Sequence, residues 1–271
     1  MDTHSKQLGL LPQAIELLLQ FPQKLGWIYR GQPDVDWDLI PQAGRKPYLE
    51  SALPVRPEEP LSKSNPTKDL GRFNHWRELS AGYSTELPEN DFECLAAAQH
   101  YGLPTRLLDF SENPLCALYF ATESHFDRDG AVFAHFPQRY INKDILDIYN
   151  VPAISALRIK PFDKRILAQR AIFLFFPDPS QPLEPEKIPE ECAIMNCGEF
   201  DVVKFAIPKA SKLIIHRQLV DIGVTRRTLF PDLDGLSRDF VAEDLYQQAF
   251  DAANQEREKI NSSNKRMEDN G

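Results

Sequence analysis

The stretch AAAQHYGLPTRLLDFSENPLCALYFAT, residues 96–122, decides how this chain folds. Its leucines and aromatic residues, such as Leu107, Leu118 and Phe120, are typical of a buried segment. The polar side chains that interrupt it are His100, Thr105, Arg106, Asp109, Ser111 and Asn113. A buried polar group destabilises a protein unless it is hydrogen-bonded. These side chains therefore either satisfy one another inside a structural turn or line a site.

The local pattern of this stretch predicts a helix, an abrupt turn, an extended segment and a second helix. Asp91 is expected to cap the first helix, which ends at Gly102. The segment RLLDF, residues 106–110, reads as a strand, and its alternation places Thr105 and Asp109 on one face. Pro114 fits the first turn of the second helix, and the side chains of Ser111 and Asn113 are the candidates for its cap.

The pattern on either side mixes helices and strands without a regular alternation of the two. Helices are expected at residues 11–22, 68–80, 144–150 and 212–223 and in a final helix before residue 254. Strands or extended pieces are expected at residues 27–31, 37–41, 130–136, 153–159, 168–177 and 201–208, and a proline-rich loop at 46–67. This organisation predicts an α+β fold in a single domain, residues 1–253 with a core at about 20–235, followed by a polar disordered tail at 254–271.

Composition excludes several classes of protein. The chain has 271 residues, a formal net charge of −9 and a sequence pI of about 5.2, which argues against a basic groove for bulk nucleic-acid binding. No secretory signal and no run of about 18 apolar residues is visible, so we expect no membrane association. The four cysteines have no metal-site spacing, which indicates reduced thiols in a cytoplasmic protein.

Three further positions are candidates for chemistry, each with a structural alternative. Arg30 lies in the strand WIYRG, where its guanidinium is suited either to a phosphate or carboxylate ligand or to a buried pair with Asp109. His100 ends a helix, where the helix dipole favours its charged form, although a structural role remains open. Gln169 enters an apolar strand and needs a hydrogen-bond partner or exposure at the strand end.

The common catalytic signatures are not visible. There is no P-loop, no G-x-G-x-x-G, no G-x-S-x-G and no cluster with metal-ligand spacing, so no metal is expected.

The motifs YRGQ (residues 29–32), WDLIP (37–41), AAQHYGLPTRLLDFSENPLCALYFA (97–121) and RILAQRAIF (165–173) resemble the FRG domain family. The resemblance covers residues 20–235. Ala171 follows AQR where the family is expected to have glycine. The resemblance to this family also implies a role in bacterial or phage defence.

A remoter resemblance is to the arginine-serine-glutamate class of mono-ADP-ribosyltransferases. YRG at residues 29–31 and DFSENPLCALYFA at 109–121 are similar to its motifs in order and spacing. This resemblance implies a split, ADP-ribosyltransferase-like sheet with flanking helices, and NAD as cofactor. It also implies that an arginine and a serine hold the cofactor and that a late-strand glutamate acts on its ribose. The matching late position here is near Gln169, and a neutral amide does not supply negative charge to an oxocarbenium-like transition state.

The first hypothesis is therefore an NAD-type nucleotide-binding domain with ADP-ribosyltransferase or NAD glycohydrolase activity and a protein or nucleic-acid acceptor. The expected substrate-binding residues are Arg30, Gln32, Thr105, Arg106 and Ser111, and the expected catalytic residues are Gln169, Asp109 and His100. The second hypothesis is a non-catalytic ligand-binding or interaction module that retains the pocket. A third is a nuclease or other hydrolase that uses Asp109, His100 and Glu112.

Overall fold

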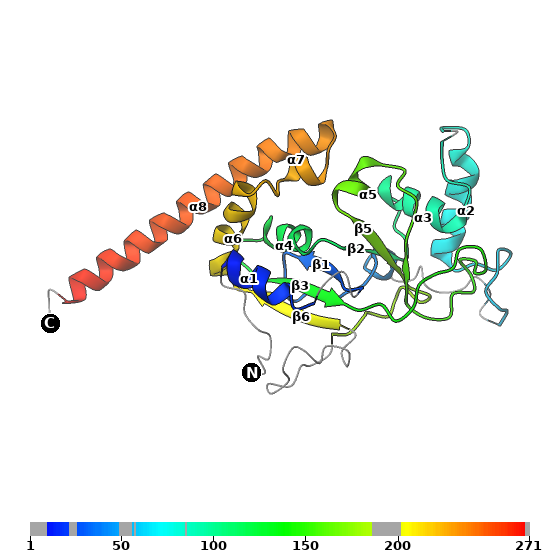
Figure 1. Cartoon of the computed structure of the whole chain (residues 1–271), viewed down its shortest axis with the longest axis horizontal. Coiled ribbons are helices and arrows are strands. Elements are labelled where there is room, and N and C mark those ends of the chain that lie inside the picture. Colours follow the sequence, from blue (N-terminus) through cyan, green and yellow to red (C-terminus); the bar gives the residue numbers. More distant parts are fainter. Residues whose placement is uncertain are drawn as a thin grey trace.

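The computed structural model describes residues 10–21, 26–48, 56, 58–84, 86–185 and 202–268. Within them the strands form one open antiparallel sheet in the order β4-β5-β2-β1-β3-β6 (Figure 1). The strands are β1 (Ile28–Gln32), β2 (Leu107–Ser111), β3 (Gly130–His135), β4 (Ser155–Leu157), β5 (Ala171–Phe175) and β6 (Val202–Ile207). The α+β class predicted from the sequence is confirmed.

Helices flank this sheet and connect its strands. They are α1 (Leu11–Leu18), α2 (Lys68–Ser80), α3 (Asp91–His100), α4 (Pro114–Thr122), α5 (Lys164–Ala168), α6 (Lys209–Asp221), α7 (Arg226–Leu229) and α8 (Leu233–Glu268), with a 3₁₀ turn η2 (Gln42–Gly44). The far end of α8 extends away from the body of the molecule (Figure 1). Within the described part of the chain, no helix is both long and apolar enough to cross a membrane.

The sheet opens between its two central strands, β1 and β2. All five residues of β1 pair with β3, and all five residues of β2 pair with β5. Between β1 and β2, however, the register contains one pair, Tyr29 with Ser111. The two strands therefore meet at that pair and separate beyond it, which divides the sheet into a β1-β3-β6 half and a β2-β5-β4 half.

Two separate apolar clusters cover one face of this divided sheet. Over the first half, α1, α4 and α6 pack on a cluster that includes Tyr29 and Phe205. Over the second half, α2 and α3 pack on a cluster that includes Leu107 and Phe173. Strand alternation places Asp109 and Ser111 on this same face, between the two clusters. The face is thus closed by helices at both sides and less completely covered in the middle.

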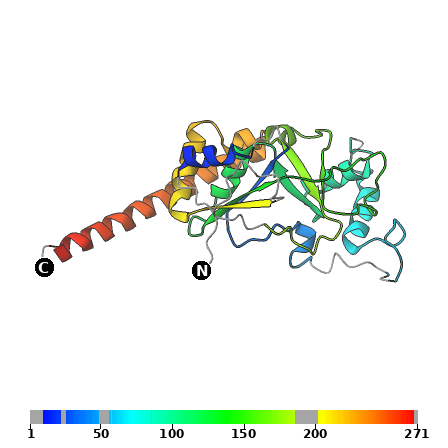
Figure 2. The ribbon, with the colours of Figure 1, turned by 60° about the horizontal axis from the view of Figure 1, so that its bottom comes forward.

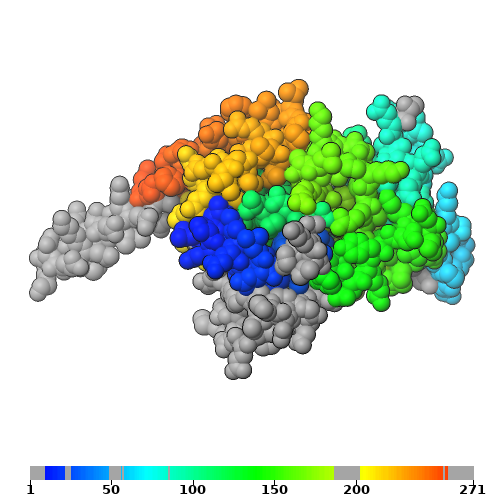
Figure 3. Space-filling view, viewed as in Figure 1, coloured from blue at the N-terminus to red at the C-terminus, as the bar shows by residue number. Residues whose placement is uncertain are grey.

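The opposite face is covered mainly by connecting segments. Ile28, Phe110 and Phe133 belong to a third cluster there, with Leu39 from the segment after β1. Figure 2 shows the blue segment that follows β1 passing below the sheet, while α1 and the yellow α6 lie above it. Figure 3 shows α1, α6 and the start of α8 side by side on one surface.

Helix α4 lies directly against β1 because residue 31 is a glycine. A Cβ atom built on Gly31 would lie 1.8 Å from the carbonyl oxygen of Ala117 and 2.7 Å from the amide nitrogen of Ala121. Only a residue without a side chain permits this approach. The YRG motif therefore sets the distance between the sheet and the helix that follows β2.

Several local predictions need correction. Asn90, not Asp91, caps α3, since its Oδ1 accepts from the amides of Phe92 and Glu93 at 3.1 and 3.4 Å. Of the two candidates for the cap of α4, Ser111 and Asn113, the structure shows Asn113, which accepts from the Leu115 amide at 3.0 Å. Asp91 is instead the first residue of α3, one position after its cap, and the Ser111 hydroxyl accepts from the amide of Asn113 at 2.8 Å.

Other element boundaries also differ from the prediction. Residues 144–150 form turns rather than a helix, and residues 37–41 form no strand. The strand expected from residue 168 begins at Ala171, because α5 occupies residues 164–168. Residues 49–55 and 57 of the predicted loop lie outside the described residues.

The backbone is helical in α8 as far as Glu268, where a disordered tail was expected from residue 254. Glutamate, glutamine, lysine and arginine are common in this segment and are good helix formers, so composition alone did not separate a tail from an exposed helix. The single-domain extent of residues 1–253 stays a prediction.

Candidate functional site

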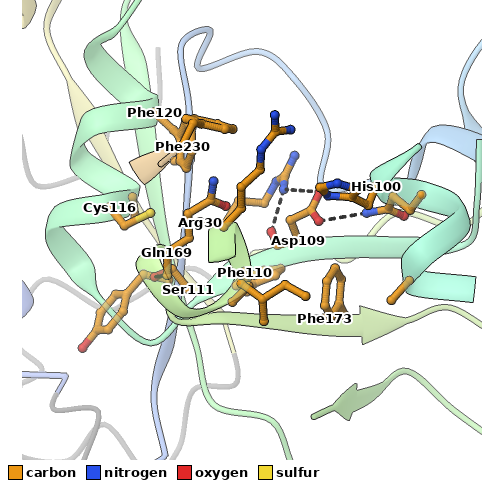
Figure 4. Close-up of a pocket in the computed structure, with 18 of the residues that line it drawn as sticks. Arg30, His100, Asp109, Phe110, Ser111, Cys116, Phe120, Gln169, Phe173 and Phe230 are labelled. Carbon is orange, nitrogen blue, oxygen red and sulfur yellow. Dashed lines mark hydrogen bonds and ion pairs between the residues drawn. The ribbon is translucent and has the colours of Figure 1, made fainter. Parts of the chain in front are cut away.

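A cavity of about 420 Å³ lies on the helix-covered face, between the two apolar clusters. Its walls come from β1, β2, α3, α4, α5, β5 and the α7–α8 junction (Figure 4). The polar and charged residues that line it are Arg30, Gln99, His100, Asp109, Ser111, Glu123, Arg165 and Gln169. Its size lies within the range of small-molecule sites in proteins.

Arg30 reaches this cavity through the opening between β1 and β2. Its Nη1 donates to the backbone carbonyl of Asp109 at 2.6 Å, in the region where β1 has stopped pairing with β2. The Asp109 carboxylate lies 4.0 Å from the same nitrogen. Nε of Arg30 is buried and has no hydrogen-bond partner among the described residues. Arg30 thus retains hydrogen-bonding capacity at the cavity wall.

Burial lowers the pKa of Arg30 to about 10, and the nearby Asp109 carboxylate opposes this shift. The guanidinium still stays charged at neutral pH. Its side chain is 18% exposed, whereas that of Asp109 is 61% exposed. The cavity wall therefore presents a partly buried positive charge with a solvated carboxylate beside it.

A chain of two hydrogen bonds, from Thr105 to Gln99 and from Gln99 to Asp109, orients the Asp109 carboxylate. Nε2 of Gln99 donates to Oδ1 of Asp109 at 2.8 Å, and the Thr105 hydroxyl donates to Oε1 of Gln99. Thr105 is 1% exposed and also accepts from the amide of Leu107 at 3.1 Å. Thr105, predicted to bind substrate, therefore lies behind the cavity wall and acts through Gln99. Figure 4 marks the contacts around Asp109.

Ser111 and Gln169 meet at the end of the cavity where β2 and β5 pair. The Ser111 hydroxyl donates to the backbone carbonyl of Gln169 at 2.6 Å and accepts from the amide of Asn113 at 2.8 Å. Nε2 of Gln169 donates to the carbonyl of Leu229 at 3.1 Å, which ties α5 to the α7–α8 junction. Both side chains line the cavity, and both are already used in holding its walls together.

His100 also lines the cavity, at the end of α3. Its Nε2 lies 3.8 Å from the carboxylate of Asp163. Its ring makes edge contacts with Tyr101 and Phe162, at centroid distances of 5.1 and 5.7 Å. The structure thus brings together Arg30, His100, Asp109, Ser111 and Gln169 of the residues predicted from the sequence.

Arg106 does not belong to this site, which corrects the sequence prediction. Its side chain is 1% exposed and forms a bidentate pair with Asp69, with both N–O distances 2.8 Å. It also donates to Thr67 at 2.6 Å and to the carbonyl of Pro177 at 2.8 Å. Strand alternation did not reveal this because the partner, Asp69, comes from α2, far away in the sequence.

Gln32 does not line the cavity either. It is 1% exposed and its Nε2 donates to the carbonyl of Asp38 at 3.3 Å. Glu112 pairs instead with Arg158 and Arg170 outside the cavity, so the trio invoked for a hydrolase does not converge. In the described residues no group of three or more His, Cys, Asp or Glu side chains is arranged to hold a metal ion.

Sequence reasoning missed a second carboxyl in the cavity, Glu123. It follows the last residue of α4 and accepts from Nη1 of Arg226 at 3.0 Å. Burial raises the pKa of Glu123 to about 7, and Arg226 opposes the shift. In the sequence Glu123 stands in the polar stretch after an apolar helix, where nothing separates it from a surface glutamate.

Aromatic rings form much of the remaining wall. The phenylalanines that line the cavity are Phe110, Phe120, Phe162, Phe173 and Phe230. Phe230 contacts the guanidinium groups of Arg226 and Arg165, 4.7 and 5.4 Å from its ring centroid. Arg165 is fixed in turn by Asp232, with an N–O distance of 2.5 Å. These contacts hold the α7–α8 junction against α5 as one side of the cavity.

Cys116 also lines the cavity, and Figure 4 draws it just below Phe120 and Phe230. Burial raises its pKa to about 12, so it is protonated at neutral pH and is a poor nucleophile.

The fold and this site define an α+β protein with an open antiparallel sheet and a cavity at its division. The family model described as the FRG domain matches residues 26–130, which confirms the resemblance seen in the sequence over this part of the chain; the expected extent of 20–235 stays a prediction outside the matched residues. The match includes Arg30, Asp109, Ser111 and Glu123, whereas α5 and the α7–α8 junction lie beyond it. No curated protein and no solved structure matches the chain.

Proposed function

We propose that this cavity binds an NAD-type nucleotide, and that the protein acts on it as an ADP-ribosyltransferase or NAD glycohydrolase. The observation that supports this most strongly is Arg30: a partly buried, charged guanidinium at the wall of a cavity of about 420 Å³, with a buried Nε that has no partner among the described residues. Guanidinium groups bind phosphate and carboxylate oxygens through paired donors, and burial strengthens such a contact.

The aromatic walls fit the remainder of such a ligand. Five phenylalanines line the cavity, and flat bases pack favourably on aromatic side chains. A nucleotide combines a planar base with an anionic phosphate, so it matches both the rings and Arg30. A purely apolar ligand would leave the Nε donor of Arg30 without a partner.

The resemblance to ADP-ribosyltransferases supports the choice of NAD. Arg30 and Ser111, its arginine and serine positions, come from adjacent strands and line one cavity. The third position is Gln169, whose amide is bonded to Leu229. The carboxyl groups of this cavity are those of Asp109 and Glu123, which are the candidates for the charge that a glutamine does not provide.

A non-catalytic module that retains the pocket is the second candidate function. It is favoured by the commitment of Ser111 and Gln169 to structural hydrogen bonds. Under either function we propose a cytoplasmic protein with a nucleotide ligand. A protein or nucleic-acid acceptor and a role in defence are part of the transferase proposal.

The test is thermal denaturation with NAD, together with a measurement of nicotinamide release. At NAD concentrations a hundred times the Kd, binding adds about 2.7 kcal/mol to stability. For a chain of this size that is a rise in Tm of about 5–10 °C. Release of nicotinamide identifies an enzyme, and stabilisation without release identifies the binding module.

Arg30→Ala is the decisive variant, and Arg217→Ala is its matched control. Arg217 is exposed and pairs with Asp221 on the surface of α6, away from the cavity. We expect R30A to lose the NAD-dependent rise in Tm and R217A to keep it. If folded R30A responds to NAD as the wild type does, Arg30 is not part of the site.

A further inference from the structure

Glu123 is placed differently from the other polar groups of the cavity. Among the described residues, the side-chain hydrogen bond and the ion pair of Glu123 are both made with Nη1 of Arg226 and both use Oε2, not Oε1. The side chain is 24% exposed and lines the cavity at the end of α4. One carboxylate oxygen therefore remains available to a ligand.

The neighbouring polar groups are already occupied. The single proton of the Ser111 hydroxyl is donated to the Gln169 carbonyl. The Gln169 amide is bonded to Leu229. Asp109 accepts from Gln99 and lies beside Arg30 in a largely exposed position. Among these groups, Arg30 and Glu123 have unused capacity of opposite kinds: Arg30 donates and Glu123 accepts.

A purely structural role for Glu123 would be to tie α4 to α7 through Arg226. In that case the pair should keep the carboxylate firmly ionised. Instead desolvation outweighs Arg226 and raises the pKa of Glu123 to about 7. Arg226 also has a second support, because its guanidinium lies 4.7 Å from the Phe230 ring centroid. Arg226 thus holds the Glu123 carboxyl in place, but its positive charge does not fully offset the desolvation of the carboxylate.

We propose that Glu123 is a ligand-binding residue that accepts a hydrogen bond from a ribose hydroxyl of the nucleotide whose phosphate is held by Arg30. This inference rests on the proposed function and specifies the ligand further: a nucleotide with a free ribose hydroxyl at its Glu123 end. A carboxylate accepts such a bond and a protonated carboxyl accepts it less well, so binding favours the ionised form. Nucleotide binding at neutral pH therefore releases a proton from Glu123.

Other charged or titratable groups face Glu123 and must be considered. Arg226 comes from α7, while Tyr119 and Cys116 come from α4 itself. Burial raises the pKa of Tyr119 and of Cys116, so neither changes charge between pH 6 and pH 8. His100 lines another part of the cavity wall, at the end of α3.

The experiment is calorimetric titration of NAD into the full chain at pH 6, 7 and 8, in two buffers of different ionisation enthalpy. With a pKa of about 7, the ionised fraction of Glu123 rises from about one tenth at pH 6 to nine tenths at pH 8. We expect the affinity for NAD to rise about tenfold over this range, with a fraction of a proton released per NAD at pH 7.

Glu123→Gln is the test variant, because glutamine still accepts from Arg226 but does not titrate. It should bind NAD with a pH-independent affinity and release no proton. Glu112→Gln is the matched control, since this carboxyl is 15% exposed and pairs with Arg158 outside the cavity. Calorimetric titration of NAD into this variant should give the same affinities and the same proton release as for the wild type.

The outcomes separate this inference from the proposed function. If the wild type binds no NAD, the proposed function is wrong and the inference falls with it. If the wild type binds NAD with a pH-independent affinity, the inference alone is wrong, a result that does not depend on the folding of any variant. Proton release that persists in E123Q also overturns it, because the proton then comes from another group.

Discussion

The buried pair of Arg106 and Asp69 is the structure's clearest departure from the sequence prediction, and it gives a quantitative test. Both side chains are 1% exposed and share two hydrogen bonds of 2.8 Å. Asp69→Ala leaves a guanidinium buried without its counter-charge. Removing one partner of a buried ion pair destabilises a protein by about 3–5 kcal/mol. For a chain of this length that corresponds to a fall in Tm of roughly 6–20 °C.

The assay is urea denaturation of the wild type, Asp69→Ala and Asp221→Ala. Asp221 provides a matched control because its pair with Arg217 is exposed, and such pairs contribute at most about 1 kcal/mol. The double variant Arg106→Met with Asp69→Leu should recover most of the loss, since it removes both buried charges. The reasoning is refuted if D69A unfolds within 1 kcal/mol of the wild type, or if a folded Arg106 variant loses NAD binding while keeping its stability.

Two further predictions concern packing and pH. Gly31→Ala should lower the free energy of unfolding by about 3 kcal/mol or more, because its Cβ would lie 1.8 Å from the Ala117 carbonyl oxygen. The measurement is urea denaturation. A free energy of unfolding within about 1 kcal/mol of the wild-type value would contradict the close contact of α4 and β1. Burial lowers the pKa of His216 to about 4, so between pH 6.5 and 4 the unfolded chain binds a proton that the folded chain does not. Lowering the pH through this window should reduce the free energy of unfolding by up to about 3 kcal/mol, and His216→Gln should lack this part of the reduction. If the urea midpoints of the wild type and His216→Gln depend on pH in the same way, His216 is not its source.

Local sequence signals predicted much of the fold. Helix α2 has the bounds expected from its pattern, and Asn113-Pro114 marks the start of α4. Strand β3 ends one residue before the prediction. These elements depend on periodicity, capping and proline chemistry, which are properties of a short segment.

The sequence predicted the site residues that are conspicuous within their own short segment, and it was wrong or silent where the role of a residue depends on a distant partner. Arg30 was recognised because an arginine in an apolar strand requires a partner or a ligand. Arg106 satisfies the same description, but its partner Asp69 comes from another helix and closes it off from the cavity. Glu123 became visible through its burial beside Arg226, which follows from the packing of α4 against the α7–α8 region. No local pattern contains that information.

The central claim is that the cavity at the division of the sheet binds a nucleotide through Arg30. A crystal structure of the full chain grown with NAD tests it most directly. We predict NAD in the cavity between β1, β2 and α4, with a phosphate oxygen about 3 Å from the Arg30 guanidinium. NAD bound elsewhere, or a cavity that stays empty at saturating NAD while Arg30 contacts only Asp109, would contradict the account.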